Sequence, residues 1–288
     1  MINAQALLQG MQHPKNAQGW GLQAISTFKD KGTGSAINPA ISGVSASYVN
    51  FNYTKFVLDI NSTTIDFANS SPYGKYGISI SSLNYGQWDE KDEQGNKIGT
   101  FGVNDLYTRV NWANQIKGNL YSGINLSYGF SRLYDYTANY LTGGMGIIYQ
   151  TKSDITLGLS AVNFVLSGKS YVKKEKLESI LVLGASKKLA YLPMRIGIDA
   201  IRTSSQNFYF NLGGLLSLER LFITWGISSK KQDLSTEDPV NNLIAGISGG
   251  FGINFEPYSL SFGYRNMGGM GAIFSFSINW AFTKGDDD

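Results

Sequence analysis

Apolar and polar residues alternate along most of the chain after residue 45. Between Ile124 and Phe130, apolar side chains occupy the even positions, while Asn, Ser and Gly occupy the odd positions. The segment from Phe274 to Phe282 repeats this pattern, with Ser, Asn and Ala between its aromatic and aliphatic residues. Successive side chains of a strand point to opposite faces, so the alternation predicts β-strands with one apolar and one polar face.

Fourteen such segments can be placed, and no stretch after residue 45 has a convincing helical period. The predicted strands lie near residues 46–53, 55–66, 75–86, 104–114, 119–132, 141–151, 154–164, 179–189, 194–202, 207–217, 220–229, 243–254, 258–265 and 271–282. Connections after even-numbered strands are short, whereas several after odd-numbered strands are long, namely 87–103, 133–140, 165–178 and 230–242. Bacterial outer-membrane barrels have an even number of strands, short periplasmic turns and longer extracellular loops. The pattern therefore predicts a closed barrel whose two ends face the periplasm.

Composition favours a membrane barrel over a soluble β-protein. Charged residues make up 16% of the chain, against roughly 25% in soluble domains, and no run of about 20 apolar residues could form a transmembrane helix. A soluble sandwich would carry more charge on its exposed face, and a propeller would repeat about every 40 residues. We therefore predict an all-β fold: a 14-stranded antiparallel transmembrane β-barrel with an N-terminal plug segment, in contact with the lipids of the bacterial outer membrane.

The residue inventory excludes several kinds of chemistry. The chain has no cysteine and one histidine, His13, which excludes thiolate metal sites, cysteine nucleophiles and multi-histidine metal sites. Its net charge of +3, without a long basic cluster, is too even for a nucleic-acid-binding protein. Two S-x-x-K matches, at 26–29 and 228–231, lack the accompanying motifs of serine acyl-transferases. We therefore expect no enzymatic activity, no cofactor, no metal and no nucleic-acid partner.

The two ends of the chain differ from the barrel. Residues 1–45 are rich in Gly, Ala and Asn-Pro, and we expect them to form a luminal or periplasmic plug that includes Asn38 and Pro39; a frayed terminus is the alternative. No signal-peptide apolar core precedes them, so we expect that a leader has been removed. The barrel is expected to span residues 46–282, and residues 283–288 to be a tail or tag remnant.

The last predicted strand resembles the C-terminal signal of outer-membrane proteins. Trp280 and Phe282 occupy alternate positions at its end. In outer-membrane proteins a terminal aromatic strand of this kind is recognised by the barrel-assembly machinery. The resemblance therefore implies that this machinery is a partner during biogenesis.

The same alternation places a few charged side chains inside the barrel. These lumen charges are Arg109, Arg195, Asp199 and Arg265. Charges inside a barrel either line a pore or pair with one another and fill the lumen. For a barrel of this size we expect pairing, with Arg195 or Arg109 against Asp199.

Six short motifs follow one another between about residues 35 and 200. They are SAINPA (35–40), SLNYGQWD (82–89), DEQGN (92–96), IGTFGVND (98–105), SRLYDY (131–136) and LPMRI (192–196). In order and spacing they resemble the PorV/PorQ family of outer-membrane proteins, relatives of the FadL-type fourteen-stranded barrels, and look closest to the PorQ branch. The resemblance implies a role in type IX secretion, in which such barrels engage secreted proteins or belong to the surface-attachment machinery.

Two main functions remain open from the sequence. The first is a protein-docking component of type IX secretion or surface attachment, which binds other secretion-system or cell-surface proteins through its extracellular loops. The expected docking residues are Trp88, Asp89, Asp92, Glu93, Phe101, Tyr134, Tyr136 and Tyr171. The alternative is a FadL-like transporter of hydrophobic small molecules, although the inward positions, mostly Ser, Asn, Gly and Thr, argue against an apolar conduit. A diffusion pore ranks third, because a plugged barrel of this size leaves little open width.

Overall fold

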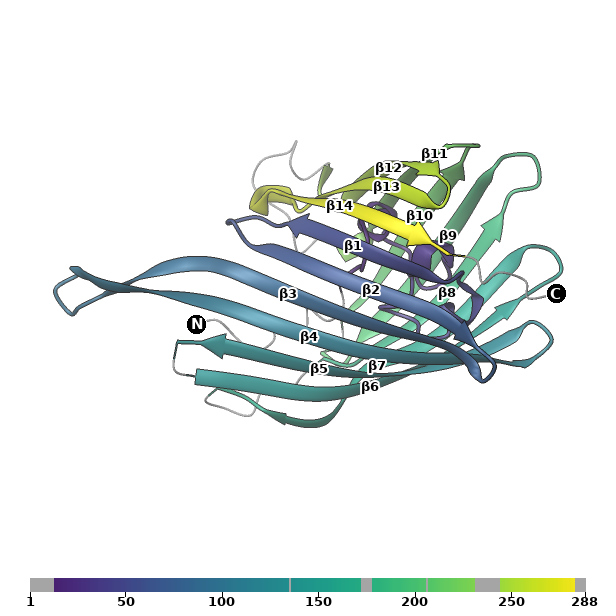
Figure 1. Ribbon diagram of the computed structural model, residues 1–288. Helices are drawn as coiled ribbons and strands as arrows, with labels where there is room; N and C mark the ends of the chain where they lie inside the picture. Colours follow the sequence, from purple (N-terminus) through teal and green to yellow (C-terminus); the bar gives the residue numbers. More distant parts are fainter. Residues whose placement is uncertain (1–12, 135, 172–177, 206, 231–243, 283–288) are drawn as a thin grey trace.

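The computed structural model describes residues 13–134, 136–171, 178–205, 207–230 and 244–282. Within these ranges the chain forms a closed barrel of fourteen antiparallel strands, in which sequence neighbours pair and β1 pairs with β14 (Figure 1). The strands are β1 (Tyr48–Lys55), β2 (Asn61–Ser71), β3 (Gly74–Lys91), β4 (Lys97–Lys117), β5 (Leu120–Leu133), β6 (Tyr136–Gln150), β7 (Ile155–Lys169), β8 (Ile180–Lys188), β9 (Met194–Thr203), β10 (Phe208–Ser217), β11 (Leu221–Ser228), β12 (Ile247–Phe255), β13 (Tyr258–Asn266) and β14 (Ala272–Ala281). The predicted 14-stranded antiparallel barrel is therefore confirmed.

Alternating side chains explain why the sheet closes on itself. On β14, Phe276 and Ile278 are 62% and 53% exposed, whereas Ser275 and Ser277 are buried. Both serine hydroxyls donate hydrogen bonds to the side-chain oxygen of Asn52 on β1, at 2.8 and 2.7 Å. Apolar side chains outside and hydrogen-bonded polar side chains inside suit a cylinder surrounded by lipid.

The barrel wall is much taller on one side. Strands β3 to β7 have 14 to 21 residues, whereas β1 and β8 to β14 have 8 to 10. A transmembrane strand needs about 9–11 residues, so β3 and β4 continue well beyond the membrane (Figure 1). They do so at the rim opposite the two barrel ends, which is the extracellular rim of an outer-membrane barrel.

Three sequence predictions about strand boundaries are wrong. The strand expected near 55–66 is β2, which begins only at Asn61. The loops expected at 87–103 and 133–140 are mostly strand, the second because β6 begins at Tyr136. Residues 85–102, which we call the projecting ribbon, form the outer ends of β3 and β4 around a turn at 92–96. Both faces of this ribbon lie outside the membrane, so its sequence lacks the apolar–polar alternation that marks the rest of the barrel. Of the loop expected at 165–178, residues 165–169 belong to β7 and residues 172–177 lie outside the described residues. The loop expected at 230–242 lies outside them except for Lys230.

Residues 13–47, which we call the N-terminal segment, lie inside the barrel. The segment contains α2 (Ala17–Leu22), a 3-10 turn η1 (Asp30–Gly32) and α3 (Ile41–Val44). Helix α2 packs against β10 to β14, and α3 packs against β3 to β5, so the segment reaches opposite sides of the wall. A second 3-10 turn, η3 (Gly268–Met270), joins β13 to β14. Residues 1–12 and the predicted tail 283–288 lie outside the described residues. In the described part of the chain, no helix is long and apolar enough to cross a membrane.

Candidate functional site in the lumen

The N-terminal segment approaches the wall most closely where the wall carries glycine. Gly213 and Gly226 face the carbonyl of Leu22, and Gly123 faces the peptide between Pro39 and Ala40. A Cβ added at such a position would press on the segment or overlap it. Eight strands contribute an inward glycine of this kind, which we call the glycine row: Gly123, Gly146, Gly158, Gly184, Gly197, Gly213, Gly226 and Gly263. At these glycine positions the segment therefore packs closely against the wall, from β5 to β11 and at β13.

Polar side chains of the wall fasten the backbone of α2. The amide of Ala17 donates to the hydroxyl of Ser277 at 2.7 Å, and Ser248 donates to the carbonyl of Gly21 at 2.8 Å. Short helices leave most of their backbone groups without partners inside the helix. The barrel wall supplies these missing partners, which explains how a helix of six residues persists in the lumen.

Asp199, one of the predicted lumen charges, holds the turn that follows α2. Its carboxylate accepts hydrogen bonds from the amides of Ile25 and Ser26, at 2.8 and 3.0 Å, and from the Ser26 hydroxyl. The expected ion pair with Arg195 or Arg109 is wrong, because the N-terminal segment supplies the donors instead. Asp199 thereby becomes a positioning residue for the segment.

The three lumen arginines also bind neutral groups. Arg109 donates to the carbonyl of Ala36 at 2.9 Å, so it too holds the N-terminal segment. Arg265 lies over the ring of Trp20, with 4.7 Å between its guanidinium carbon and the ring centroid. Arg195 donates to hydroxyls on β7 and β8 at 3.3–3.4 Å. All three side chains face the lumen, as the alternation predicts.

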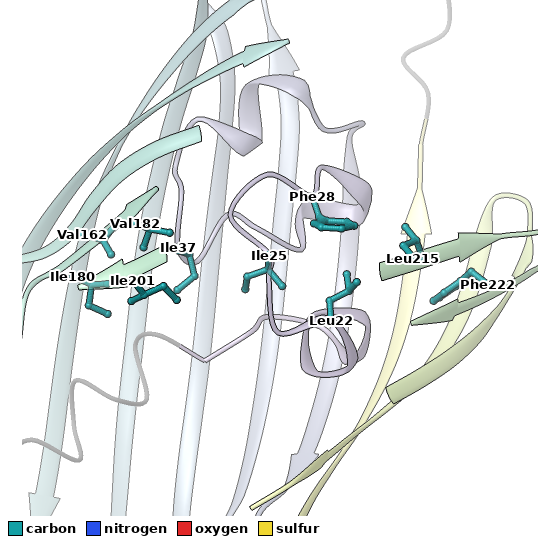
Figure 2. Close-up of a cluster of buried hydrophobic side chains, with 10 residues drawn as sticks. All are labelled: Leu22, Ile25, Phe28, Ile37, Val162, Ile180, Val182, Ile201, Leu215 and Phe222. Atoms are coloured by element: carbon teal, nitrogen blue, oxygen red, sulfur yellow. The ribbon is translucent and has the colours of Figure 1, made fainter. Parts of the chain in front are cut away.

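A cavity of about 390 Å³ lies in the lumen beside the N-terminal segment. Its lining includes residues at the extracellular ends of β8, β11 and β13, so it lies at the extracellular end of the lumen. One wall is apolar, where side chains from β8 and β9 meet two isoleucines of the segment (Figure 2). The apolar wall consists of Ile25, Ile37, Ile180, Val182 and Ile201.

The opposite wall of the cavity is polar. The His13 imidazole lies on this wall. Its ring packs 5.3 Å from the Trp20 ring. The polar wall includes His13, Gln23, Asn211, Ser228, Lys230 and Arg265. The cavity therefore offers a ligand one apolar side and one hydrogen-bonding side; the described residues contain no cluster of metal-ligating side chains.

The aromatic residues predicted for docking gather on the projecting ribbon. Trp88 pairs with Phe101 across the ribbon. Tyr134 packs edge-on against Phe101, with 5.9 Å between ring centroids, and its hydroxyl donates to Glu90 at 3.0 Å. The structure thus brings Trp88, Phe101 and Tyr134 together outside the membrane.

The acidic residues predicted for docking lie on the same ribbon. Asp89 forms a 2.6 Å ion pair with Lys97, and Glu93 lies at the exposed tip. Asp92 accepts hydrogen bonds from the amides of Gln94 and Asn96, at 3.0 and 2.8 Å. Hydrogen bonds, chiefly from the Asn96 side chain, hold the pKa of Asp92 below its usual range. Asp89 and Asp92 therefore stabilise the ribbon itself.

The two other tyrosines predicted for docking lie apart. Tyr136 begins β6 and is 55% exposed. Tyr171 instead bonds to Ser131 and packs at the edge of a buried lumen cluster. The buried members of this cluster are Leu83, Tyr107, Ala138 and Tyr140. Tyr171 therefore belongs to the filling of the outer lumen.

The residues predicted for the plug and for the assembly signal lie at opposite faces of the wall. Asn38 is fully buried, and its amide nitrogen donates to the carbonyl of Ile147 at 3.3 Å. Pro39 lies against Gly123 of the glycine row. Trp280 is 46% exposed on the outer surface, where its ring lies 5.5 Å from that of Phe282.

Sequence reasoning missed the apolar wall of the cavity. Ile180 and Val182 share the inward face of β8 with Gly184, and Ile201 shares that of β9 with Asp199. The alternation of apolar and polar residues already indicates this wall, because it places these three side chains on the inward face of their strands, near the extracellular ends. The argument that inward positions are too polar for an apolar conduit therefore fails at this end of the lumen.

Comparisons with known proteins identify the fold. Similar solved structures include the Pseudomonas putida toluene transporter TodX, with a TM-score of 0.63 and 10% identity, covering 93% of this chain and 96% of that one. CymD, a monoaromatic hydrocarbon channel, has a TM-score of 0.58 and 11% identity, covering 94% and 98%. A Pseudomonas aeruginosa FadL homologue has a TM-score of 0.52 and 10% identity, covering 94% and 99%.

These likenesses define the fold: the chain has the fourteen-stranded barrel fold of FadL-type proteins of the bacterial outer membrane. No family model and no curated protein matches the chain. The comparisons do not support the finer resemblance to the PorV/PorQ family, nor a role in type IX secretion.

Proposed function

We propose that this barrel carries hydrophobic small molecules across the outer membrane. The observation that carries the proposal is the apolar wall of the lumen cavity at its extracellular end. Val182 and Ile201 lie opposite each other on β8 and β9, and both are buried. Ligand pockets of this kind combine apolar walls with a few polar groups, in volumes of about 300–1,000 Å³.

The similar structures suggest a first ligand class. TodX is a toluene transporter and CymD is a monoaromatic hydrocarbon channel. Sequence identity of 10–11% shows a shared fold and not a shared ligand. We therefore propose the ligand class for this chain and do not infer it from the likeness alone. Monoaromatic hydrocarbons are therefore the first molecules to test.

The route is constrained by the glycine row. Close packing of the N-terminal segment against β5 to β11 obstructs passage along the barrel axis on that side. Beside the cavity, β8 pairs with β7 only as far as Val162 opposite Ile180, and the next residue, Asn163, has a positive φ of 64°. Among the described residues, β7 has no partner on that side beyond Val162.

The proposal is tested by uptake of radiolabelled toluene into intact cells that produce the barrel. Val182→Asn removes apolar surface from the cavity wall. Because burying an aliphatic side chain is worth about 1.5–3 kcal/mol, uptake at low toluene concentration should fall roughly tenfold or more. Leu83→Asn is the matched control, since Leu83 is an inward apolar residue in the other cluster, away from the cavity.

Heat-modifiable mobility on gels reports whether each variant folds. Uptake that falls for Val182→Asn and persists for Leu83→Asn supports the proposal. Equal uptake by folded Val182→Asn and unmodified barrel contradicts it.

A further inference from the structure

The projecting ribbon has two free edges, unlike the closed wall below it. Strand β2 pairs with β3 only as far as Asn84, and β5 pairs with β4 only as far as Val103. Beyond these points, β3 and β4 pair only with each other in the described part of the chain. Figure 1 shows the ribbon extending past the neighbouring strands. Unpaired strand edges present rows of amide and carbonyl groups to a further strand.

The two edges differ in how well they are protected. The β3 edge has a register shift between Asn84 and Gln87, with Gly86 at a φ of 85°, and then the charged run 89–91. Bulges and charges are the usual devices that prevent a strand edge from pairing. The β4 edge carries no charge along residues 98–102 (IGTFG); a register shift leaves Ile98 without a partner on β3, and the pairing is regular from Gly99 to Gly102. Each edge therefore has one bulge, but only the β3 edge also carries a charged run, while the β4 edge keeps an uncharged, regular stretch at 99–102.

We propose that the β4 edge of the projecting ribbon binds an extended segment of a partner polypeptide as an added strand. Backbone pairing along 98–102 supplies the affinity, as in other cases of strand addition. Phe101, with Tyr134 packed on it, offers an aromatic contact to alternate side chains of the partner. This binding surface lies outside the lumen and does not depend on the proposed transport.

Charge defines the chemistry of the partner. The ribbon carries Asp89, Glu90, Asp92 and Glu93 against Lys91 and Lys97. Asp89 is paired with Lys97, and Asp92 is bonded within the tip, which leaves Glu93 exposed at the turn. An antiparallel strand on β4 runs toward this tip. The partner segment is therefore uncharged and rich in β-branched residues along its length, and basic at its C-terminal end.

The test uses the whole barrel in lipid nanodiscs and three synthetic peptides with blocked ends. The probe TVTVTVKK matches the proposed chemistry, TPTVTPKK lacks the backbone amide donors of its second and sixth residues, and TVTVTVEE reverses the charge. Fluorescence anisotropy of labelled peptides measures binding, and amide hydrogen exchange locates it. We expect saturable binding of TVTVTVKK, weaker binding of TVTVTVEE and none of TPTVTPKK, with exchange slowed at residues 98–102.

Glu93→Gln should weaken binding of TVTVTVKK by about twofold, as for an exposed charge pair. Equal binding of the proline peptide, or protection at residues 87–91 instead of 98–102, overturns strand addition at the β4 edge. The amides of residues 98–102 could also become protected from hydrogen exchange as the barrel concentration rises, without any peptide. That result shows that a second copy of the barrel occupies the edge, and it overturns the assignment to a partner polypeptide.

Discussion

The lumen wall consists of two unlike halves. From β5 to β11, and again on β13, the wall meets the N-terminal segment through the glycine row, and above this contact lies the open cavity. On β14 and β1 to β4 the inward positions carry hydrogen-bonding side chains, and the outer lumen above them is filled by the tyrosine cluster. The inward polar residues of this second half include Asn50, Asn52, Thr64, Asp66, Ser79, Ser81, Arg109, Asn111, Ser275 and Ser277.

The difference concerns how each half tolerates change. A backbone that lies directly against another backbone leaves no space, and close-packed interiors respond strongly to each added methyl group. A network of hydroxyl and amide side chains has alternative partners, so that the loss of one bond is partly compensated. We therefore expect the glycine half to be sensitive to substitution and the polar half to be tolerant.

The largest effect is expected from adding methyl groups to the glycine row. Gly213→Ala combined with Gly226→Ala places two Cβ atoms against the carbonyl of Leu22. Overpacking costs about 1–3 kcal/mol per site, so the N-terminal segment should detach and become cleavable by trypsin at Lys29 and Lys31.

The matched control is Gly77→Ala on β3, where the nearest atom, the Phe67 carbonyl oxygen, lies 3.1 Å away and no atom of the segment is among the nearest. If trypsin cleaves the N-terminal segment no faster in the double variant than in the control, the glycine contacts do not hold the segment.

The next effect is expected at Asp199. Asp199→Ala leaves the amides of Ile25 and Ser26 without their acceptor, and hydrogen bonds to charged groups are each worth about 1.5–3 kcal/mol. Denaturant unfolding in detergent should therefore show a loss of a few kcal/mol. Asp199→Asn keeps one acceptor oxygen and should lose less; equal losses for the two variants would contradict the assigned role.

A smaller effect is expected in the polar half. Ser277→Ala removes the acceptor for the Ala17 amide and the donor to Asn52. A single neutral hydrogen bond contributes about 1 kcal/mol, and Ser275 still donates to the same Asn52 oxygen. The unfolding midpoint should shift only slightly, and a shift as large as that of Asp199→Ala would remove the distinction between the two halves.

The smallest effect is expected at the tip of the projecting ribbon, outside the barrel. The pKa of Asp92 is depressed by hydrogen bonds, so its contribution is present above the usual pKa of aspartate and is lost as the pH falls through the depressed value. Amide exchange at Gln94 and Asn96, corrected for intrinsic rates, should rise in acid while the β14 amides stay protected. Unchanged protection at the tip in strong acid would show that Asp92 does not hold the turn.

The sequence predicted the barrel because the membrane imposes alternation on each strand that it surrounds. The predicted strand near 271–282 and the observed β14 nearly coincide for this reason. The projecting ribbon escaped prediction, since water on both faces of 85–102 imposes no such pattern. The partners of Asp199 also escaped, because alternation says which way a side chain points but not which segment meets it. Only the fold brings Ile25 and Ser26 to that carboxylate.

The candidate site was predictable in part. The sequence shows that the side chains of Ile180, Val182 and Ile201 face the lumen. Their contact with Ile25 and Ile37 depends on the path of the N-terminal segment. That path has no periodic pattern, and it is determined by glycines on several different strands. Because the N-terminal segment and several strands enclose this cavity together, it cannot be recognised from one strand at a time.

Binding of a hydrophobic molecule in the lumen cavity can be seen in a crystal soaked with bromobenzene. An anomalous bromine peak is expected between the side chains of Val182, Ile201 and Ile25, and should be absent from crystals of Val182→Asn. Bromine peaks confined to the outer, lipid-facing surface, with the cavity empty of bromobenzene, would contradict it.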